Sequence, residues 1–382
     1  MAYVASTSTE DPSDNQLAIV TAHVGIVRDA LEARGVQFAV VEDSTELGLT
    51  LVTLRAGQLA AIGPADPLGD LLAEVYDEFR VRYAGWVPTM GRNREVGPVT
   101  GAPHTIDGGG TGLPTPVEPR FPPRAAEPGS GVRVGVADTA LWGHPWLSGA
   151  YQAAPASTWA ASGSAPDYLV GHATFVAGLV LRRAPGATVE ARRVLDADAK
   201  ARSWDVAKEL VRFARSGIDV LNLSFGCLTD DNRPPLVLAT ALDRLDPRVV
   251  VVAAAGNHGN TPDGSRPMWP AALEEVVAVA TMDADGKSPD WSPPVELPWI
   301  DVTATGVDVA STYLDGEVRL PDATRGTFAG FADWSGTSFS AAQVSGAIAG
   351  RIVPGETGAR TALAQLLAGA TRPGGAGVPW IR

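Results

Sequence analysis

Hydrophobic residues beyond about position 130 come in short runs of two alternating kinds. Runs of strand length, rich in β-branched residues, are VRVGVAD, ATVEARRVL, IDVLNLS, RVVVVAAAG and EEVVAVATM. Between them lie runs of helical length, namely GHATFVAGLVLRRA, SWDVAKELVRFARSG and PPLVLATALDRL. This alternation is typical of a parallel sheet flanked by helices. We therefore predict an α/β domain over residues 131–382, with functional side chains just after the carboxyl ends of its strands.

The first ninety residues predict a smaller α/β domain over residues 16–90, preceded by a polar, disordered N-terminus over residues 1–15. Leu17, Val20, Val24, Val27 and Leu31 recur at steps of three and four, which predicts an amphipathic helix. Two strand-like runs follow at 36–42 and 49–54, and a second helical pattern covers 68–79. Residues 91–130 are expected to form a linker or an extended strap, because 13 of the 30 residues from 101 to 130 are Gly or Pro.

Charge and cysteine content narrow the possible partners and the compartment. Of the 382 residues, 43 are Asp or Glu and 30 are Lys or Arg, a balance that argues against binding nucleic acid or an anionic membrane. The single cysteine, Cys227, cannot form an intramolecular disulfide. The N-terminus lacks a basic segment followed by an apolar one, and no apolar run reaches the roughly 20 residues of a membrane span. We expect a cytoplasmic protein.

Four polar residues stand out in the predicted α/β domain: Asp138, His172, Asn257 and Ser338. Each has an ordinary structural explanation taken alone: a strand-end cap, a buried core histidine, a turn asparagine and a helix-capping serine. All four, however, have small-residue flanks and follow the same kind of element. The order Asp, His, Ser matches the order of the triad in subtilisin and differs from that of chymotrypsin and the α/β-hydrolases.

The blocks around these residues resemble the signature blocks of subtilisin-like serine peptidases. They are Asp138-Thr139-Ala140, GHATFVAG around His172, SFG at 224–226, AAGN ending at Asn257, ATGVDVAST at 304–312, and GTSFSAAQVSG around Ser338. The resemblance covers residues 131 to about 370. This chain departs from the usual family residues at Ala140, Ala173, Phe175, Ala342 and Gln343, and in the segment DADAKARSW at 196–204, where the family has a glycine-rich substrate-binding strand.

The resemblance implies a subtilisin-like fold and a role for each residue. Ser338 would be the nucleophile, His172 the general base, and Asp138 the group that orients His172. Asn257 would donate a hydrogen bond to the oxyanion, together with the Ser338 backbone N–H. Ser224, Phe225 and Gly226 would form one edge of the substrate groove, and residues 198–202 the other.

The expected activity is that of a serine endopeptidase that works through an acyl-enzyme, in intracellular precursor processing or regulated proteolysis. Its partner would be a peptide or protein bound in extended form. No cofactor is required for this chemistry. Structural calcium sites, which occur in the family, stay open, because no Asp-rich loop has ligand spacing.

Several alternatives stay open from the sequence. A catalytically silent peptide-binding module with the same fold is the rival function, although such a module would not need all four polar residues. The N-terminal domain is either a cleaved inhibitory prosegment or a permanent domain that recruits substrate. Cys227 is either a small buried residue or a neighbour of a substrate pocket, and His258, next to Asn257, is expected to point away from the site.

Overall fold

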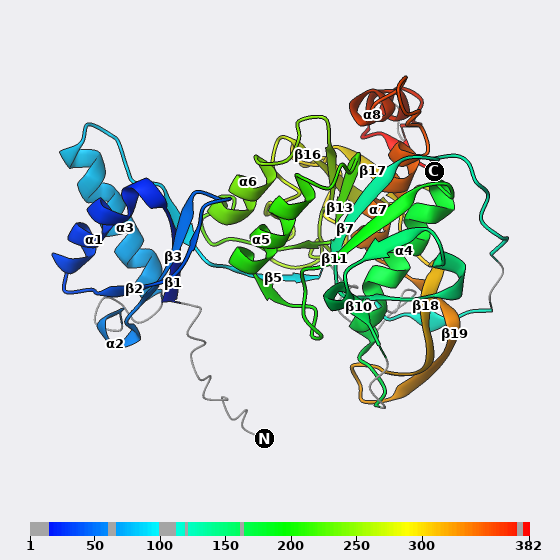
Figure 1. The fold of residues 1–382 in the computed structure, drawn as a ribbon, viewed down its shortest axis with the longest axis horizontal. Coiled ribbons are helices and arrows are strands. Elements are labelled where there is room, and N and C mark those ends of the chain that lie inside the picture. The colour runs from blue at the N-terminus through cyan, green and yellow to red at the C-terminus, as the bar shows by residue number, and fades with distance from the viewer. Residues whose placement is uncertain (1–14, 60–65, 99–111, 119–120, 161–163, 373–376) are drawn as a thin grey trace. The chain divides into compact units, whose positions relative to one another are not determined.

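The computed structural model describes residues 15–59, 66–98, 112–118, 121–160, 164–372 and 377–382, which fall into two compact units. The first unit contains residues 15–94 with 202–208 and 235–243, and the second contains the rest of the described chain (Figure 1). None of the helices in these ranges is both long and apolar enough to cross a membrane.

The first unit is built on a four-stranded antiparallel sheet in the order β2-β3-β1-β4. These strands are β1 (Gln16–Val20), β2 (Phe38–Ser44), β3 (Leu49–Leu54) and β4 (Met90–Arg92). Its helical elements are η2 (Thr21–His23), α1 (Val24–Glu32), α2 (Ala56–Leu59) and α3 (Pro67–Arg82). Buried residues of β1, β3, α1 and α3 share one core, and Asp66 caps α3 by accepting a hydrogen bond from the Gly69 N–H.

One prediction for this unit is wrong. The helix expected from Leu17 to Leu31 begins only at Val24, because Gln16–Val20 is strand β1. This strand pairs with β3 on one side and β4 on the other, so its backbone groups are satisfied by distant segments. The periodicity of so short an apolar run does not distinguish a helix from a strand, and pairing with distant strands makes these residues a strand.

The second unit confirms the predicted α/β architecture. Its eight-stranded parallel sheet has the order β20-β17-β16-β15-β13-β7-β11-β9. The strands are β7 (Arg133–Asp138), β9 (Tyr151–Ala153), β11 (Thr188–Arg193), β13 (Val220–Leu223), β15 (Val250–Ala254), β16 (Val276–Met282), β17 (Val302–Thr305) and β20 (Trp380–Ile381). The predicted helical runs form α4 (His172–Arg183), α5 (Ser203–Phe213) and α6 (Leu236–Leu242), and a further helix is α7 (Thr337–Ala349). Of these, α4 and α7 belong to the second unit, whereas α6 and the first residues of α5 are grouped with the first.

Helices α4 and α7 pack against each other and against the sheet (Figure 1). Glycines make this close approach possible. A Cβ atom at Gly346 in α7 would lie 2.6 Å from the Val180 carbonyl oxygen of α4. A Cβ at Gly178 in α4 would lie 2.3 Å from hydroxyl groups on β18 (Val309–Arg319). Larger residues at either position would push α4 away from its neighbours.

The predicted linker contains ordered segments that belong to the second unit. Strand β6 (Thr115–Pro116) pairs with β19 (Arg325–Trp334), which forms a hairpin with β18. Arg124 donates hydrogen bonds to the carbonyl oxygens of Trp146, Ser148 and Pro185. Described residues 112–118 and 121–130 therefore form an ordered strap over the second unit. The boundary drawn at residue 90 falls inside β4, and residues 99–111 lie outside the described chain.

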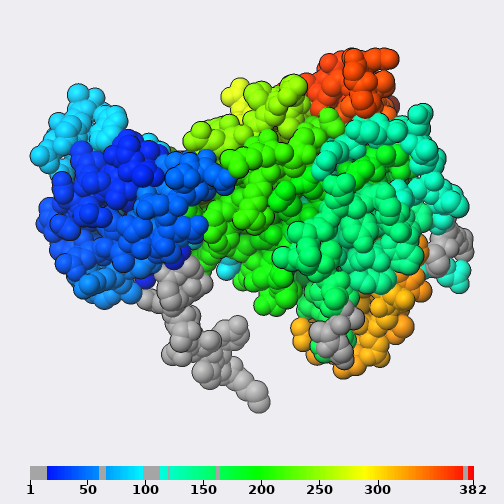
Figure 2. All heavy atoms as spheres, viewed as in Figure 1, coloured from blue at the N-terminus to red at the C-terminus, as the bar shows by residue number. Residues whose placement is uncertain are grey.

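Short elements complete the second unit. Strands β8 (Leu141–Trp142) and β10 (Thr158–Trp159) form a small parallel pair, and 3-10 turns are η3 (Pro145–Leu147), η4 (Pro155–Ser157) and η5 (Tyr168–Gly171). A separate three-stranded sheet has the order β12-β5-β14, from β12 (Ala201–Arg202), β5 (Glu95–Pro98) and β14 (Phe225–Gly226). Helix α8 (Ala359–Ala368) lies at the surface near the C-terminal end (Figure 2).

Candidate active site

The four polar residues singled out from the sequence lie at the ends of elements of the second unit. Asp138 is the last residue of β7, and His172 is the first residue of α4. Asn257 follows the carboxyl end of β15, and Ser338 lies in the first turn of α7. All four side chains are buried, with Asp138 1% exposed, Asn257 8%, and His172 and Ser338 0%. The carboxyl ends of the parallel strands bring them to one edge of the sheet.

Asp138 fixes the orientation of His172. The His172 Nδ1 atom lies 2.8 Å from Asp138 Oδ1 and 2.9 Å from Oδ2, and Oδ1 also accepts a hydrogen bond from the Thr139 N–H. A carboxylate at this position favours the proton on Nδ1, which leaves Nε2 as the basic nitrogen of a neutral ring. Within the described chain, buried Nε2 has no hydrogen-bond partner. The rings of Trp334 and Phe339 flank the imidazole, with centroids 5.7 and 5.5 Å away.

Asn257 is held by its carbonyl oxygen. Its Oδ1 accepts hydrogen bonds from the Thr337 N–H and from Thr337 Oγ1, both at 3.0 Å. The same hydroxyl oxygen accepts a hydrogen bond from the Gly256 N–H at 3.1 Å. This network identifies Nδ2 as the outward atom, and it is buried without a hydrogen-bond partner among the residues that the structure describes. An unpaired buried donor is uncommon in a folded protein and is what an oxyanion requires.

Ser338 is anchored through Ser224. The Ser338 Oγ atom lies 3.4 Å from the Ser224 carbonyl oxygen, and Ser224 Oγ donates a hydrogen bond to the Ser338 carbonyl oxygen at 3.2 Å. Asn222 continues the network by donating to Ser224 Oγ and accepting from Ser345 Oγ, both at 2.9 Å. These contacts fix the start of α7 against β13. Within the described residues His172 Nε2 makes no hydrogen bond to Ser338, and such bonds often tighten only in the substrate complex.

The two predicted edges of the substrate groove are both paired with the chain itself. Strand β5 lies between β12 and β14 in their three-stranded sheet. It runs antiparallel to β14, with Gly97 opposite Gly226 and Pro98 opposite Phe225. The sequence interpretation missed this strand, since β5 comes just before the Gly/Pro-rich segment and is only four residues long.

The departures from the family pattern are accommodated by packing. Phe175 is fully buried, with its ring 4.4 Å from that of Phe339. Gln343 Oε1 accepts a hydrogen bond from Arg183 at 2.6 Å, which ties α7 to α4. Cys227 is buried, and its backbone exchanges two hydrogen bonds with Trp269 at 2.9 and 3.0 Å. Sequence interpretation also missed Thr337, although the hydroxyl residue directly before Ser338 was a signal for it.

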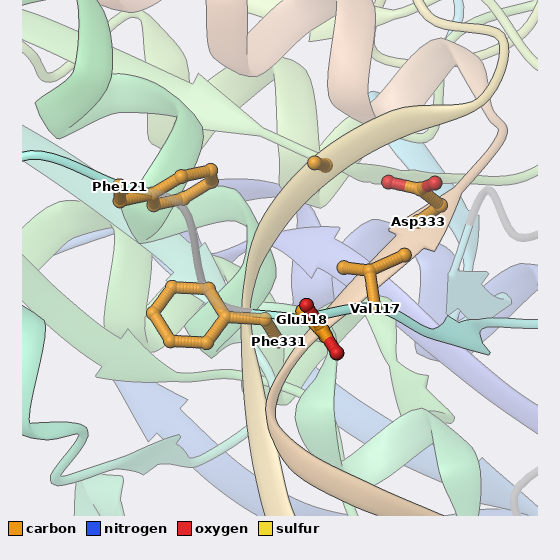
Figure 3. Close-up of a pocket in the computed structure, with 6 residues that line it drawn as sticks. Val117, Glu118, Phe121, Phe331 and Asp333 are labelled. Atoms are coloured by element: carbon orange, nitrogen blue, oxygen red, sulfur yellow. The ribbon is translucent and has the colours of Figure 1, made fainter.

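A cavity of about 370 Å³ lies between the strap and the β18–β19 hairpin (Figure 3). Its lining residues are Val117, Glu118, Phe121, Ala310, Phe331 and Asp333. The rings of Phe121 and Phe331 lie 5.0 Å apart, and burial raises the pKa of Asp333. The lining includes none of the four candidate catalytic residues, so this cavity is separate from the candidate active site. Across the described ranges, no three His, Cys, Asp or Glu side chains are grouped as metal ligands.

Comparison with known proteins identifies the family. The subtilase family model, Peptidase_S8, matches residues 129–353, more than half of the chain. This chain belongs to the subtilase family. The match confirms the resemblance seen in the motifs, and the protein is a subtilisin-like serine endopeptidase. It is 32% identical to "Subtilisin BL" of Lederbergia lenta over 233 residues, which cover 58% of this chain and 76% of that protein.

Solved structures show the same fold for this subtilase. A structure described as a "Lanthipeptide Protease" matches with a TM-score of 0.56 and 24% identity, covering 67% of this chain and 87% of that one. The "Prenylagaramide maturation protease PagA" matches with a TM-score of 0.51 and 25% identity, covering 63% of this chain and 84% of that one. The parallel sheet with its flanking helices is therefore shared with peptidases of known structure.

Proposed function

We propose that this subtilase hydrolyses peptide bonds with Ser338 as nucleophile, His172 as general base and Asp138 as its orienting carboxylate. The observation that carries this assignment is the pair of buried atoms His172 Nε2 and Asn257 Nδ2, which have no hydrogen-bond partner in the described chain. Each atom is held in place by a hydrogen bond at the opposite end of its side chain, from His172 Nδ1 to Asp138 and from the Thr337 N–H to Asn257 Oδ1. A base needs a free nitrogen and an oxyanion needs a free donor, so these two atoms match the demands of acyl transfer.

The reaction proceeds in two halves. Ser338 Oγ attacks the carbonyl carbon of the substrate while its proton passes to His172 Nε2, and the resulting oxyanion accepts hydrogen bonds from Asn257 Nδ2 and the Ser338 N–H. The start of α7 adds a favourable dipole at this oxygen. His172 then protonates the leaving amine, the C–N bond breaks, and an acyl-enzyme remains. Water, deprotonated by His172, hydrolyses the ester and regenerates Ser338.

Strand β5 supports a proposal about regulation. It occupies the position in which an extended substrate would pair with β14, so the chain blocks its own groove in this arrangement. We infer that the peptidase is held inactive until β5 leaves the groove, by cleavage or by movement, which suits the processing of a precursor. The name of the PagA structure describes a maturation protease, which supports the same inference. The lone cysteine supports an intracellular setting.

The first experiment measures the intact mass of the purified protein after incubation with a fluorophosphonate that labels activated serines, alongside Ser338→Ala. One adduct on the wild type alone is the expected result. An adduct on a full-length chain would favour a permanent N-terminal domain, and an adduct on a chain shortened before residue 131 would favour a cleaved prosegment. No adduct on a folded wild-type protein from which β5 has been displaced would favour the silent peptide-binding module.

Displacement of β5 is tested by Gly97→Pro with Gly97→Ala as its matched control. A Cβ at Gly97 meets nothing within 4 Å, so alanine should be tolerated. Proline removes the backbone N–H and is incompatible with the middle strand of a sheet. We expect Ser338 to be labelled at least about tenfold faster in the proline variant than in the alanine variant. Equal rates in the two variants would mean that β5 does not block the groove.

A further inference from the structure

The pairing of β5 with β14 shows which substrate residue would lie at the nucleophile. Gly97 faces Gly226 and Pro98 faces Phe225, so the next residue of a strand in this register faces Ser224. The Ser224 carbonyl oxygen is 3.4 Å from Ser338 Oγ. A substrate bound in the same register therefore presents to Ser338 the carbonyl of the residue opposite Ser224. That residue, P1, supplies the acyl group, and the proposed function is assumed in assigning it this role.

The direction of the P1 side chain follows from strand geometry. Directly paired residues of antiparallel strands point to the same face, and side chains alternate between faces along a strand. P1, opposite Ser224, therefore points to the face toward which a side chain at Gly226 would point. A Cβ at Gly226 would lie 2.6 Å from Sδ and 2.8 Å from Cγ of Met268. The P1 side chain is thus directed toward Met268.

Met268 also reaches the segment that carries the oxyanion donor. A Cβ at Gly256, next to Asn257, would lie 2.9 Å from Met268 Cε. Gly256 has a φ of +107°, a conformation that favours glycine. The same hypothetical Cβ at Gly256 would lie 2.4 Å from His258 Nδ1, so His258 is the second side chain packed against this glycine. Met268 is 8% exposed, and its carbonyl oxygen accepts a hydrogen bond from the Ala272 N–H at 2.8 Å. Its thioether therefore fills the space between two glycine-bearing segments.

We propose that Met268 forms the floor of the P1 pocket and restricts this peptidase to small P1 residues, namely glycine, alanine and serine. A phenylalanine, leucine or lysine side chain would have to displace a buried methionine that occupies the space beside Gly226 and Gly256. Sequence separation hides this specificity determinant, because Met268 lies 42 residues after Gly226 and 11 after Asn257.

The test compares kcat/KM for fluorogenic peptides that differ only at P1, using full-length Gly97→Pro as the background with an open groove. Wild-type Met268 should favour alanine over phenylalanine by at least about 100-fold. Met268→Gly should raise kcat/KM for the phenylalanine peptide by at least about tenfold and leave the alanine peptide within about threefold. Met268→Leu, which keeps the volume, should preserve the wild-type preference.

Labelling by the fluorophosphonate gives the concentration of active sites and separates the possible failures. If Ser338 is labelled and the protein with Met268 cleaves after phenylalanine as well as after alanine, the Met268 assignment is wrong while the peptidase function stands. The same conclusion follows if Met268→Gly is labelled normally but gains nothing on phenylalanine. If Met268→Gly fails to fold, Met268→Ala replaces it, and the assignment is then tested by the P1 preferences of Met268→Ala and of the protein that keeps Met268. Absence of label in every variant would overturn the proposed function and this assignment with it.

Discussion

Replacing Asn257 separates catalysis from stability, because the two ends of this side chain have different partners. Its Oδ1 accepts two hydrogen bonds from Thr337, whereas its Nδ2 is buried and has no partner in the described chain. Alanine removes both ends of the amide. Aspartate keeps an acceptor for Thr337 and places an oxygen where Nδ2 lies, so it removes only the donor and adds negative charge beside the oxyanion.

The expected magnitudes differ for the two ends. Loss of one side-chain oxyanion donor lowers kcat by about 10²–10³, or about 2.7–4 kcal/mol at the transition state, a magnitude measured on a subtilisin itself. Asn257→Ala also leaves the buried Thr337 N–H without its acceptor, which should lower the free energy of unfolding by about 1–3 kcal/mol. Asn257→Asp should stay closer to the wild type in stability, because a carboxylate at the start of α7 is favoured by the helix dipole.

The assay combines urea unfolding with peptide hydrolysis in the Gly97→Pro background, normalised to the active sites that the fluorophosphonate labels. We expect both Asn257 variants to lose at least about 100-fold in kcat with little change in KM, since the oxyanion exists only in the transition state. The alanine variant should be the less stable of the two, and the aspartate variant should be no more active. A folded Asn257→Ala protein with less than a tenfold loss in kcat would refute the oxyanion assignment.

Three further predictions use other contacts of the catalytic unit. Asp138→Asn should lower kcat by about 10⁴, because an amide favours the wrong tautomer of His172, and hydrolysis at a normal rate by a folded variant would contradict the triad. Gly178→Ala should lower the free energy of unfolding, measured in urea, by about 1–3 kcal/mol, because its Cβ would lie 2.3 Å from two hydroxyl groups of β18. Gly25→Ala is the control: a Cβ at Gly25 meets nothing within 4 Å, so this variant should not be destabilised. Burial lowers the pKa of His144 below its ordinary value of 6.5, so on acidification the unfolded chain takes up a proton at this histidine before the folded protein does. The free energy of unfolding therefore decreases as the pH is lowered below about 6.5. Glutamine at position 144 does not titrate, so the unfolding free energy of His144→Gln should fall less steeply on acidification than that of the wild type, by up to about 1.4 kcal/mol per pH unit. Equal pH slopes for the two proteins would argue against the lowered pKa.

Sequence patterns predicted the second unit well because its strands are buried on both faces. Runs such as 250–254 and 276–280 are continuously apolar and lie in the buried strands β15 and β16. The same method failed at 16–20, where five residues fit either a helical stripe or a strand and distant partners decided between them. Local pattern is informative where one kind of element dominates a long run, and it is ambiguous where a short run depends on non-local pairing.

The candidate site could be predicted as a set of residue types but not as a geometry. Motifs identified Asp138, His172, Asn257 and Ser338. They did not reveal that Thr337 holds the Asn257 amide in one orientation, or that β5 pairs with β14, because both facts depend on contacts between segments 80 or more residues apart. The Gly/Pro content of the following segment also concealed an ordered strap, since composition describes the freedom of an isolated chain and not the partners it meets in the fold.

Chemistry and specificity are placed on different parts of this fold, which explains why sequence motifs report one and not the other. Asp138 ends a central strand, and Ser338 begins a buried helix, so neighbouring side chains fix these positions and small flanking residues mark them in the sequence. Met268 lies instead in a loop, attached to the groove through the backbone pairing of Trp269 with Cys227. A change at Met268 would alter the shape of the P1 pocket without disturbing any contact of His172 or Asn257 described above. Peptidases with the same four polar residues can therefore differ widely in what they cleave, and we expect the P1 preference of this one to depend on a residue that its catalytic motifs do not contain.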